Sequence, residues 1–257
     1  MSMNLHVIST GSKGNCYLLT DDQGRVIALD AGVTVKSIFT ALHHDISNLD
    51  GALITHEHGD HFFSVPSLCK LGVPVYASEG TISDVTSREI FKQRNGTALP
   101  VTSDGRFDVF KVGNWYVQPF STQHDAADPV GYLLSNFNGN KILYATDTYY
   151  LRYTFTALSH IIIECNYCTD ILMHNIEAGN ISGARKDRLL HSHFSLENVL
   201  KFLKATDLTH CIKIVLVHLS DGNSNAKQMV NAVFKQTGIE TIAAEDGMTI
   251  DFNLTPF

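Results

Sequence analysis

The stretch THEHGDH at residues 55–61 places three histidines and two carboxylates directly after the apolar run GALI at residues 51–54. A short apolar run of this kind predicts a buried strand, with the histidines at its C-terminal end. Imidazoles and carboxylates crowded into one loop would carry an uncompensated desolvation cost, which a bound cation offsets. The stretch therefore predicts a metal site and not a solvated loop.

The spacing His-x-His-x-Asp-His divides these ligands between two ions. His56 and His58 lie two residues apart and face one ion, whereas Asp60 and His61 lie further along and face a second. We expect Gly59 to let the backbone turn between the two pairs. The stretch is not the helical H-E-x-x-H motif, because position 60 is Asp.

Three further candidate ligands also follow apolar, β-rich runs. They are His124 after QPFSTQ, Asp147 after KILYAT and His218 after IKIVLV. Short strands that each bring a polar residue to one sheet edge are a rigid way to build a site. By position, His124 completes the first ion's ligands, His218 completes the second's and Asp147 bridges the two. Imidazole and carboxylate ligands favour Zn²⁺ or Mn²⁺, with Fe²⁺ as a further option, over Ca²⁺.

Two other patterns carry weaker signals. Glu57 lies outside any matched motif, and we interpret it as a solvent-facing or supporting residue instead of a general base. Cys165 and Cys168 form an isolated C-x-x-C, which is a weak indication of zinc or redox chemistry in the absence of a second pair. Neither pattern enters the predicted site.

The order of elements along the chain limits the fold. A β-rich first part, a mixed part, a second β-rich part and a mixed last part suit two mixed sheets packed face to face with helices outside, a four-layer αββα sandwich of the α/β (α+β) class. Periodicity alone does not separate this from a doubly wound α/β sheet. Helices are expected at residues 34–44, 62–72, 82–94, 195–205 and 225–236. We expect one domain over residues 1–257.

Composition agrees with a globular protein that has a sizeable core, because 44% of the 257 residues are hydrophobic and 18% are charged. No apolar run reaches the length of a membrane span, and the N-terminus lacks a signal-peptide pattern, so we expect a cytoplasmic protein without membrane contact. The net charge of -7 argues mildly against a large nonspecific nucleic-acid footprint. Two bound divalent ions would locally offset that charge.

Five blocks in a fixed order resemble the metallo-β-lactamase superfamily. They are ALDAG with Asp30, THEHGDH, the lone His124, YATDT with Asp147 and VLVHLS with His218. The resemblance spans nearly the whole chain. It implies the αββα sandwich, a dinuclear metal cleft at one sheet edge and a supporting role for Asp30.

Shorter blocks narrow the resemblance to the WalJ/YycJ-type hydrolases of this superfamily. STGSKGNCYLL at residues 9–19 is similar to their SGSxGNC signature, and HSHFSLENV at residues 191–199 is similar to their GHLSN block, with Ser192 in place of Gly. IIIECNY is similar to EANHD, with Asn166 kept and Tyr167 in place of His. These likenesses imply a 5′-to-3′ exonuclease acting on DNA. At 257 residues the chain is too short for the β-CASP domain of larger nucleases, so we expect none.

The resemblance also implies roles for single residues. Asp60 would orient or deprotonate a water, and a metal-bridging hydroxide would attack phosphorus. His193, in the GHLSN-like block, would protonate the leaving oxygen. In the turn GSKGN, Ser12, Lys13 and Asn15 are candidate substrate contacts, although a plain tight turn is an equal alternative.

Two other functions stay open at this point. One is a small-substrate hydrolase of the same fold, acting on a cyclic or nucleotide phosphodiester, a lactone or a thioester, which the acidic charge favours slightly. The other is a non-enzymatic metal-binding protein, which a complete ligand set with room for a bridging water disfavours. A DNA substrate is the expected partner, and the oligomeric state stays open.

Overall fold

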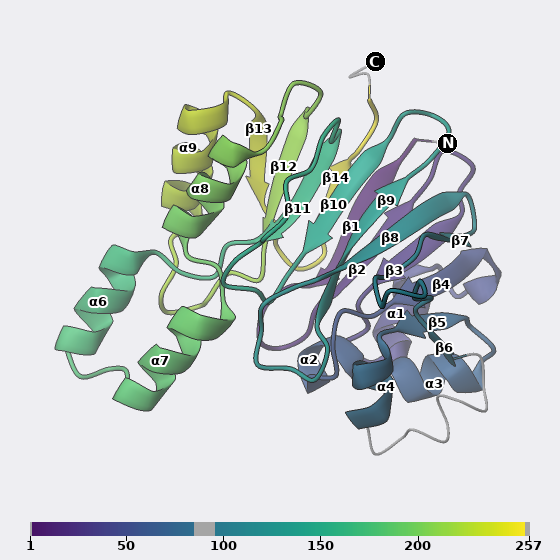
Figure 1. The fold of residues 1–257 in the computed structure, drawn as a ribbon, viewed down its shortest axis with the longest axis horizontal. Helices are drawn as coiled ribbons and strands as arrows, with labels where there is room; N and C mark the ends of the chain where they lie inside the picture. The colour runs from purple at the N-terminus through teal and green to yellow at the C-terminus, as the bar shows by residue number, and fades with distance from the viewer. Residues whose placement is uncertain (1, 85–95, 255–257) are drawn as a thin grey trace. The chain divides into compact units, whose positions relative to one another are not determined.

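The computed structural model describes residues 2–84 and 96–254. The chain divides into two compact units, and each is described by itself. Unit 1 comprises Met1–Ser121, Ala126–Asn138 and Glu245–Phe257, and unit 2 comprises Thr122–Asp125 and Gly139–Ala244. The strands belong to two seven-stranded mixed sheets flanked by helices (Figure 1), which confirms the predicted fold class and excludes a single doubly wound sheet. Within the described residues, no helix has the length and apolar character needed to cross a membrane.

Unit 1 contains one complete sheet. In hydrogen-bonded order its strands are β14 (Thr249–Asp251), β1 (Asn4–Ser9), β2 (Cys16–Thr20), β3 (Val26–Leu29), β4 (Leu49–Leu53), β5 (Val75–Ala77) and β6 (Gly96–Ala98). Pairing is antiparallel from β14 to β3 and parallel from β3 to β6. The parallel strands β3 and β4 therefore end at the same edge, where Asp30 and the His56 loop follow them.

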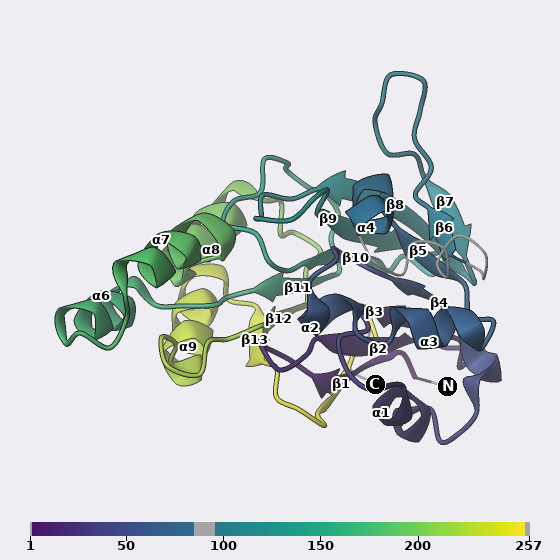
Figure 2. The ribbon, with the colours of Figure 1, turned by 90° about the horizontal axis from the view of Figure 1, so that it is seen from below.

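Helices of unit 1 pack on one face of this sheet (Figure 2). Ile38 of α1 (Val35–Ala41) and Leu68 of α3 (Val65–Lys70) join a buried cluster with Ala28 and Ala52 of the strands. Thr34 caps α1 by accepting a hydrogen bond from the backbone of Ser37. The other elements in the described part of unit 1 are the 3-10 helix η1 (Ile46–Asn48), α2 (Gly59–Phe62), α4 (Glu79–Asp84) and the antiparallel strands β7 (Phe110–Val112), β8 (Trp115–Ser121) and β9 (Val130–Ser135).

Unit 2 is built on parallel strands. They are β10 (Lys141–Ala145), β11 (His160–Glu164), β12 (Lys213–Val217) and β13 (Glu240–Ala243), each paired with the next. All five residues of β11 are buried, as expected for a strand covered on both faces. Because parallel strands end at the same edge, Asp147 after β10, Glu164 at the end of β11 and His218 after β12 meet there.

The helices of unit 2 are α6 (Thr169–Glu177), α7 (Gly183–Ser192), α8 (Leu196–Ala205) and α9 (Ala226–Thr237). The predicted helices at residues 195–205 and 225–236 correspond to α8 and α9, which lie side by side next to β12 and β13 (Figure 1). α6 and α7 were not predicted; their apolar residues follow the helical period less closely than those of α8.

Two predicted helices differ from the structure. The helix expected at residues 62–72 is two shorter ones, α2 and α3, separated by two residues, because Pro66 in the first turn of α3 has no N–H to continue the hydrogen bonding of α2. The helix expected at residues 82–94 overlaps α4 only at its start, and residues 85–94 lie outside the described part of the chain.

Candidate active site

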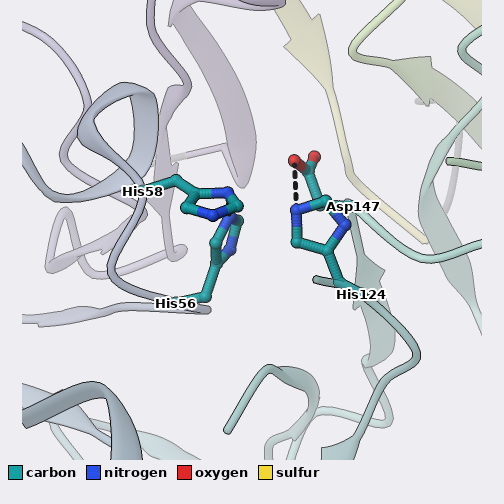
Figure 3. A group of neighbouring side chains, drawn as sticks. All are labelled: His56, His58, His124 and Asp147. Carbon is teal, nitrogen blue, oxygen red and sulfur yellow. Dashed lines mark hydrogen bonds and ion pairs between the residues drawn. The ribbon is translucent and has the colours of Figure 1, made fainter. Parts of the chain in front are cut away.

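The first histidine pair of the motif lies in unit 1, directly after β4. The Nε2 atom of His56 lies 3.0 Å from the Nδ1 atom of His58, and the two rings meet edge to face with centroids 4.6 Å apart. Figure 3 shows these ring nitrogens turned toward each other. Two imidazole nitrogens that converge in this way can share a proton or bind one cation, so the pair fits the predicted metal ligands.

The third histidine is held by a buried carboxylate. His61 is fully buried, and its Nδ1 lies 2.8 Å from Oδ2 of Asp30. Asp30 also accepts hydrogen bonds from the backbone N–H and hydroxyl of Thr55, at 2.8 and 3.0 Å. The Nε2 atom of His61 faces Oδ2 of Asp60 at 3.6 Å. A carboxylate at Nδ1 fixes the ring orientation, as second-shell carboxylates do in metal sites, and Nε2 also lies 3.1 Å from the side-chain amide of Asn15.

Backbone contacts fix Asp60 and His61 in place. The Asp60 carbonyl accepts a hydrogen bond from the N–H of Asn15 at 2.7 Å, and the His61 carbonyl accepts one from Ala31 at 2.8 Å. The chain approaches so closely that a Cβ on Gly32 would lie 1.6 Å from the Asp60 carbonyl oxygen. Glycine is therefore required at position 32 by space.

Gly59 does not have the role expected of it. Its φ lies outside the left-handed region, and a Cβ there would meet nothing within 4 Å. Instead of a glycine-dependent turn, the motif starts the short helix α2, with His58 at its N-cap position. Glu57 accepts a hydrogen bond from the N–H of Ala127 at 2.7 Å, which is the supporting role predicted for it.

The GSKGN turn packs against the same motif. Asn15 is fully buried, and its side chain bonds to the backbone of Gly11 and lies 3.1 Å from Nε2 of His61. Its amide therefore positions the turn and the motif and is not open to solvent. Ser12 and Lys13 are exposed at the tip of the turn and remain available to a substrate.

In unit 2, the imidazole of His124 faces the carboxylate of Asp147. Its Nδ1–H donates to the carbonyl of Ser192 at 2.8 Å, and burial lowers the pKa of the ring, which favours the neutral form. The Nε2 atom then presents a lone pair to Oδ2 of Asp147, 3.5 Å away, an interaction drawn as a dashed line in Figure 3. A cation suits two facing lone pairs, so this donor set fits a divalent metal.

A second group of ligand atoms gathers at the edge of the parallel strands. One ligand atom each from Asp147, Glu164, His193 and His218 lies within 4.8 Å of the others. The Nδ1–H of His218 donates to Oδ1 of Asp147 in a short hydrogen bond. The sequence predicted three of these four residues and missed Glu164.

Glu164 holds His193 and the surrounding backbone. It is fully buried and accepts hydrogen bonds from the backbone N–H groups of Thr148 and Phe194, at 3.0 and 3.1 Å. Its Oε1 atom lies 2.6 Å from Nδ1 of His193, whose side chain is 15% exposed. Burial disfavours the charged imidazole, but the Glu164 carboxylate outweighs this and raises the pKa of His193 to about 9. This raised pKa favours the protonated form of the ring at neutral pH, and the side chain is partly exposed.

Three of the site residues lie in a strained backbone conformation. Asp30, Asp147 and His218 have φ values of 58°, 46° and 54°; Asp30 and His218 directly follow β3 and β12, and Asp147 lies two residues beyond the end of β10. A residue other than glycine pays about 1–2 kcal/mol for the left-handed region. Such strain persists where the surroundings fix the residue, and it is common at functional sites.

The C-x-x-C pair does not join this chemistry. Cys165 and Cys168 are buried, and burial raises the pKa of both thiols, which favours the unreactive protonated form. Across residues 2–84 and 96–254, no cysteine takes part in a candidate metal group.

Two mixed sheets with histidine and carboxylate clusters at their strand ends define a scaffold for divalent cations. The β-lactamase superfamily domain matches residues 25–219, which is most of the chain. The chain belongs to this superfamily, as its sequence blocks predicted.

Curated relatives cover nearly the whole chain. It is 27% identical to the exodeoxyribonuclease WalJ of Streptococcus pneumoniae strain D39, over 96% of this chain and 91% of that protein. It is 28% identical to the exodeoxyribonuclease YycJ of Bacillus anthracis, over 93% of this chain and 91% of that protein. These similarities agree with the predicted resemblance to WalJ/YycJ-type proteins.

Solved structures share the fold at low sequence identity. The metallo-β-lactamase fold protein YhfI from Bacillus subtilis superposes with a TM-score of 0.69 at 14% identity, over 97% of this chain and 99% of that one. The short form of human tRNase Z superposes with a TM-score of 0.64 at 17% identity, with the same coverage. These likenesses concern the fold alone.

Proposed function

We propose that the protein is a divalent-metal-dependent phosphodiesterase and, more specifically, an exodeoxyribonuclease that degrades DNA from the 5′ end. The choice of DNA is supported by similarity to two curated exodeoxyribonucleases over more than nine-tenths of the chain. Membership of the β-lactamase superfamily supports a hydrolytic reaction.

The single observation that best supports a hydrolytic function is the Glu164–His193 pair. A protonated, solvent-reaching imidazole lies within 4.8 Å of the ligand atoms of Asp147 and His218. A leaving alkoxide needs a proton, and a positioned acid of this kind supplies it. A purely structural metal site would have no use for such a group.

The metal ligands we propose follow the spacing of the motif. One ion would be held by His56, His58 and His124, the other by Asp60, His61 and His218, and both by Asp147. The donor set of imidazoles and carboxylates favours Zn²⁺ or Mn²⁺, with Fe²⁺ as a further option. When bound, these ions supply Lewis acidity, which makes a water more acidic and offsets charge on the phosphoryl group.

The chain's own residues would perform the proton transfers. Asp60 is partly exposed, with 27% of its side chain accessible, so its carboxylate can orient a water and take its proton. His193 would donate a proton from Nε2 to the leaving oxygen, while Glu164 keeps the ring in place through Nδ1. Ser12 and Lys13 would contact the phosphate backbone from the exposed turn.

The experiment measures bound metal by elemental analysis and then hydrolysis with Mn²⁺ or Zn²⁺. The substrates are 5′-phosphorylated linear duplex DNA, single-stranded DNA and bis-p-nitrophenyl phosphate, and Asp60→Ala is the inactive comparison. Release of nucleotides from the 5′ end, lost in Asp60→Ala, is the expected result.

Two results would count against the proposal. Cleavage of the small diester alone would favour the small-substrate hydrolase, which agrees with the acidic net charge of -7. If the protein binds two metals but hydrolyses none of these substrates, the enzymatic function is excluded and a metal-binding protein remains.

A further inference from the structure

We propose that residues 148–153 of unit 2, here called the tyrosine loop, are a platform on which the bases of a single-stranded nucleic-acid end stack beside Asp147. The inference rests on the proposed function and adds to it which part of the substrate, the bases near the strand end, this loop binds. Stacking on aromatic rings combined with a positively charged path for the backbone is the general mode of single-strand binding.

Three side chains of the loop are exposed, whereas Thr148 and Leu151 are buried. Tyr150 is 54% exposed and Tyr153 is 42% exposed, and the exposed Arg152 lies between them in the sequence. Isolated exposed apolar residues are ordinary on protein surfaces, but two accessible aromatic rings and a guanidinium within four residues form a specific combination. Aromatic rings accept any base face, and a guanidinium binds phosphate or stacks on a base.

The backbone of the loop is fixed in advance. The hydroxyl of Thr148 donates to the carbonyl of Tyr150 at 2.8 Å and accepts from the N–H of Gln123 at 2.9 Å. The N–H of Tyr149 donates to the carbonyl of Gln123 at 3.2 Å, and the amide of Asn198 donates to the carbonyl of Tyr149 at 3.2 Å. Little conformational entropy is therefore lost when a ligand binds, which favours affinity.

The loop lies next to two candidate metal ligands. It begins directly after Asp147, and its hydrogen bonds to Gln123 join it to the neighbour of His124. Consecutive Cα atoms are 3.8 Å apart, so the Cα of Tyr150 lies no more than about 11 Å from that of Asp147. Stacked nucleotides rise about 3.4 Å each along a strand, so this distance spans roughly three nucleotides.

Local charge favours a polyanion in spite of the acidic chain. Arg152 is fixed by a hydrogen bond from its guanidinium to Oε1 of Gln123 at 2.8 Å. α7 adds Lys186 and Arg188, whose guanidinium pairs with Asp125 at 3.0 Å, and its exposed His191 lies edge to face with Tyr149, at 6.2 Å between ring centroids. An unpaired strand suits this surface better than a duplex, because bases in a duplex already stack on each other.

The test measures binding of a fluorescent 5′-phosphorylated oligothymidylate with phosphorothioate linkages, which resist hydrolysis, to the metal-loaded full chain. Tyr150→Ala should weaken binding about 5- to 100-fold, the range for the loss of one base–aromatic stack. Tyr150→Phe keeps the ring and should restore most of the affinity. Phe137→Ala is the matched control, because Phe137 is 84% exposed and lies beyond the end of β9 that is remote from Thr55.

A second variant tests the guanidinium. Arg152→Ala should make the dependence of log affinity on log salt shallower by about 0.7, the value for one phosphate contact on a single strand. Arg106→Ala, which removes an exposed arginine of unit 1, is its control. An oligouridylate of the same length distinguishes DNA from RNA, because stacking is shared and the 2′-hydroxyl is not.

Equal binding by wild type and Tyr150→Ala would overturn the inference, as would equal losses in Tyr150→Ala and Phe137→Ala. Tight binding of a protein partner in place of the oligonucleotide would also overturn it. Because the probe is not cleaved, these outcomes are separate from the failure of the proposed function, which is the absence of hydrolysis.

Discussion

Each unit of the molecule contains a buried carboxylate bonded to the Nδ1 atom of a histidine. In unit 1, Asp30 holds His61 at 2.8 Å, and in unit 2, Glu164 holds His193 at 2.6 Å. The imidazole of His61 is fully buried, whereas that of His193 is 15% exposed. The same pair can thus orient a metal ligand or maintain a proton donor, and access to solvent separates the two roles.

The largest effect should follow from removal of the unit 1 carboxylate. Asp30→Ala leaves the N–H of Thr55 and Nδ1 of His61 without their buried acceptor, which should cost about 3 kcal/mol in the free energy of unfolding and release metal. Chemical denaturation and elemental analysis measure both. Asp104→Ala, in an exposed ion pair, should leave both unchanged. Full metal content in Asp30→Ala would show that the Asp30–His61 pair does not support metal binding.

The unit 2 pair should affect turnover instead of folding. His193→Ala should lower kcat about 10²- to 10⁴-fold, the usual contribution of a general acid. Glu164→Gln should also lower kcat, because a neutral amide no longer stabilises the protonated ring. Steady-state kinetics on linear DNA measures both variants. A change in KM alone would place His193 in substrate binding instead.

Close packing in unit 1 gives a third, smaller effect. Gly32→Ala places a methyl group against the Asp60 carbonyl and should cost about 1–3 kcal/mol in stability, with weaker metal binding. Gly59→Ala is the control, because a Cβ at this position of the THEHGDH motif would meet open space. This variant should be close to wild type. Thermal unfolding and metal titration compare the two. Equal behaviour of the two variants would contradict the packing described for the loop.

The pH dependence of kcat sharpens the contrast further. The proton on His193 is present below its pKa of about 9 and is lost as the pH rises through that value, so activity should fall on the alkaline side. A bound cation near Asp147 opposes protonation, and the alkaline limb should therefore lie below pH 9 in the metal-loaded enzyme. This limb should be absent from His193→Ala, whose residual rate should not fall in that range.

The smallest effect is expected at the exposed turn of unit 1. Lys13→Ala removes one positive charge from the surface and should raise KM for DNA a few-fold, with less effect at high salt. Kinetics at two salt concentrations test this. Ser12→Ala is a milder change at the neighbouring position, and a larger effect there than in Lys13→Ala would assign the contact to the hydroxyl.

The sequence indicates candidate ligands most clearly where an apolar strand is followed by a polar residue. His56, Asp147 and His218 follow this pattern, and their strands place them at sheet edges. Glu164 follows it too, at the end of the buried run HIII, but its pairing with His193 depends on a loop nearly thirty residues away. An acidic residue at the end of a buried strand was the available signal.

Other features depend on tertiary packing and could not be predicted. The burial of Asn15 depends on three loops meeting around Asp60, which no local pattern reports. The open space around Gly59 and the crowding at Gly32 are likewise invisible in the sequence, where both are glycines beside a motif. The different roles of His61 and His193 could not be predicted either, because the fold sets the solvent access of each ring.

The metal content of two variants tests the account most directly. His61→Ala and His193→Ala, purified in parallel and analysed for metal per chain, change equivalent members of the two pairs. We predict that His61→Ala loses bound metal, whereas His193→Ala keeps the wild-type metal content and loses turnover. Loss of metal in His193→Ala, with full retention in His61→Ala, would contradict the assignment of ligand and acid.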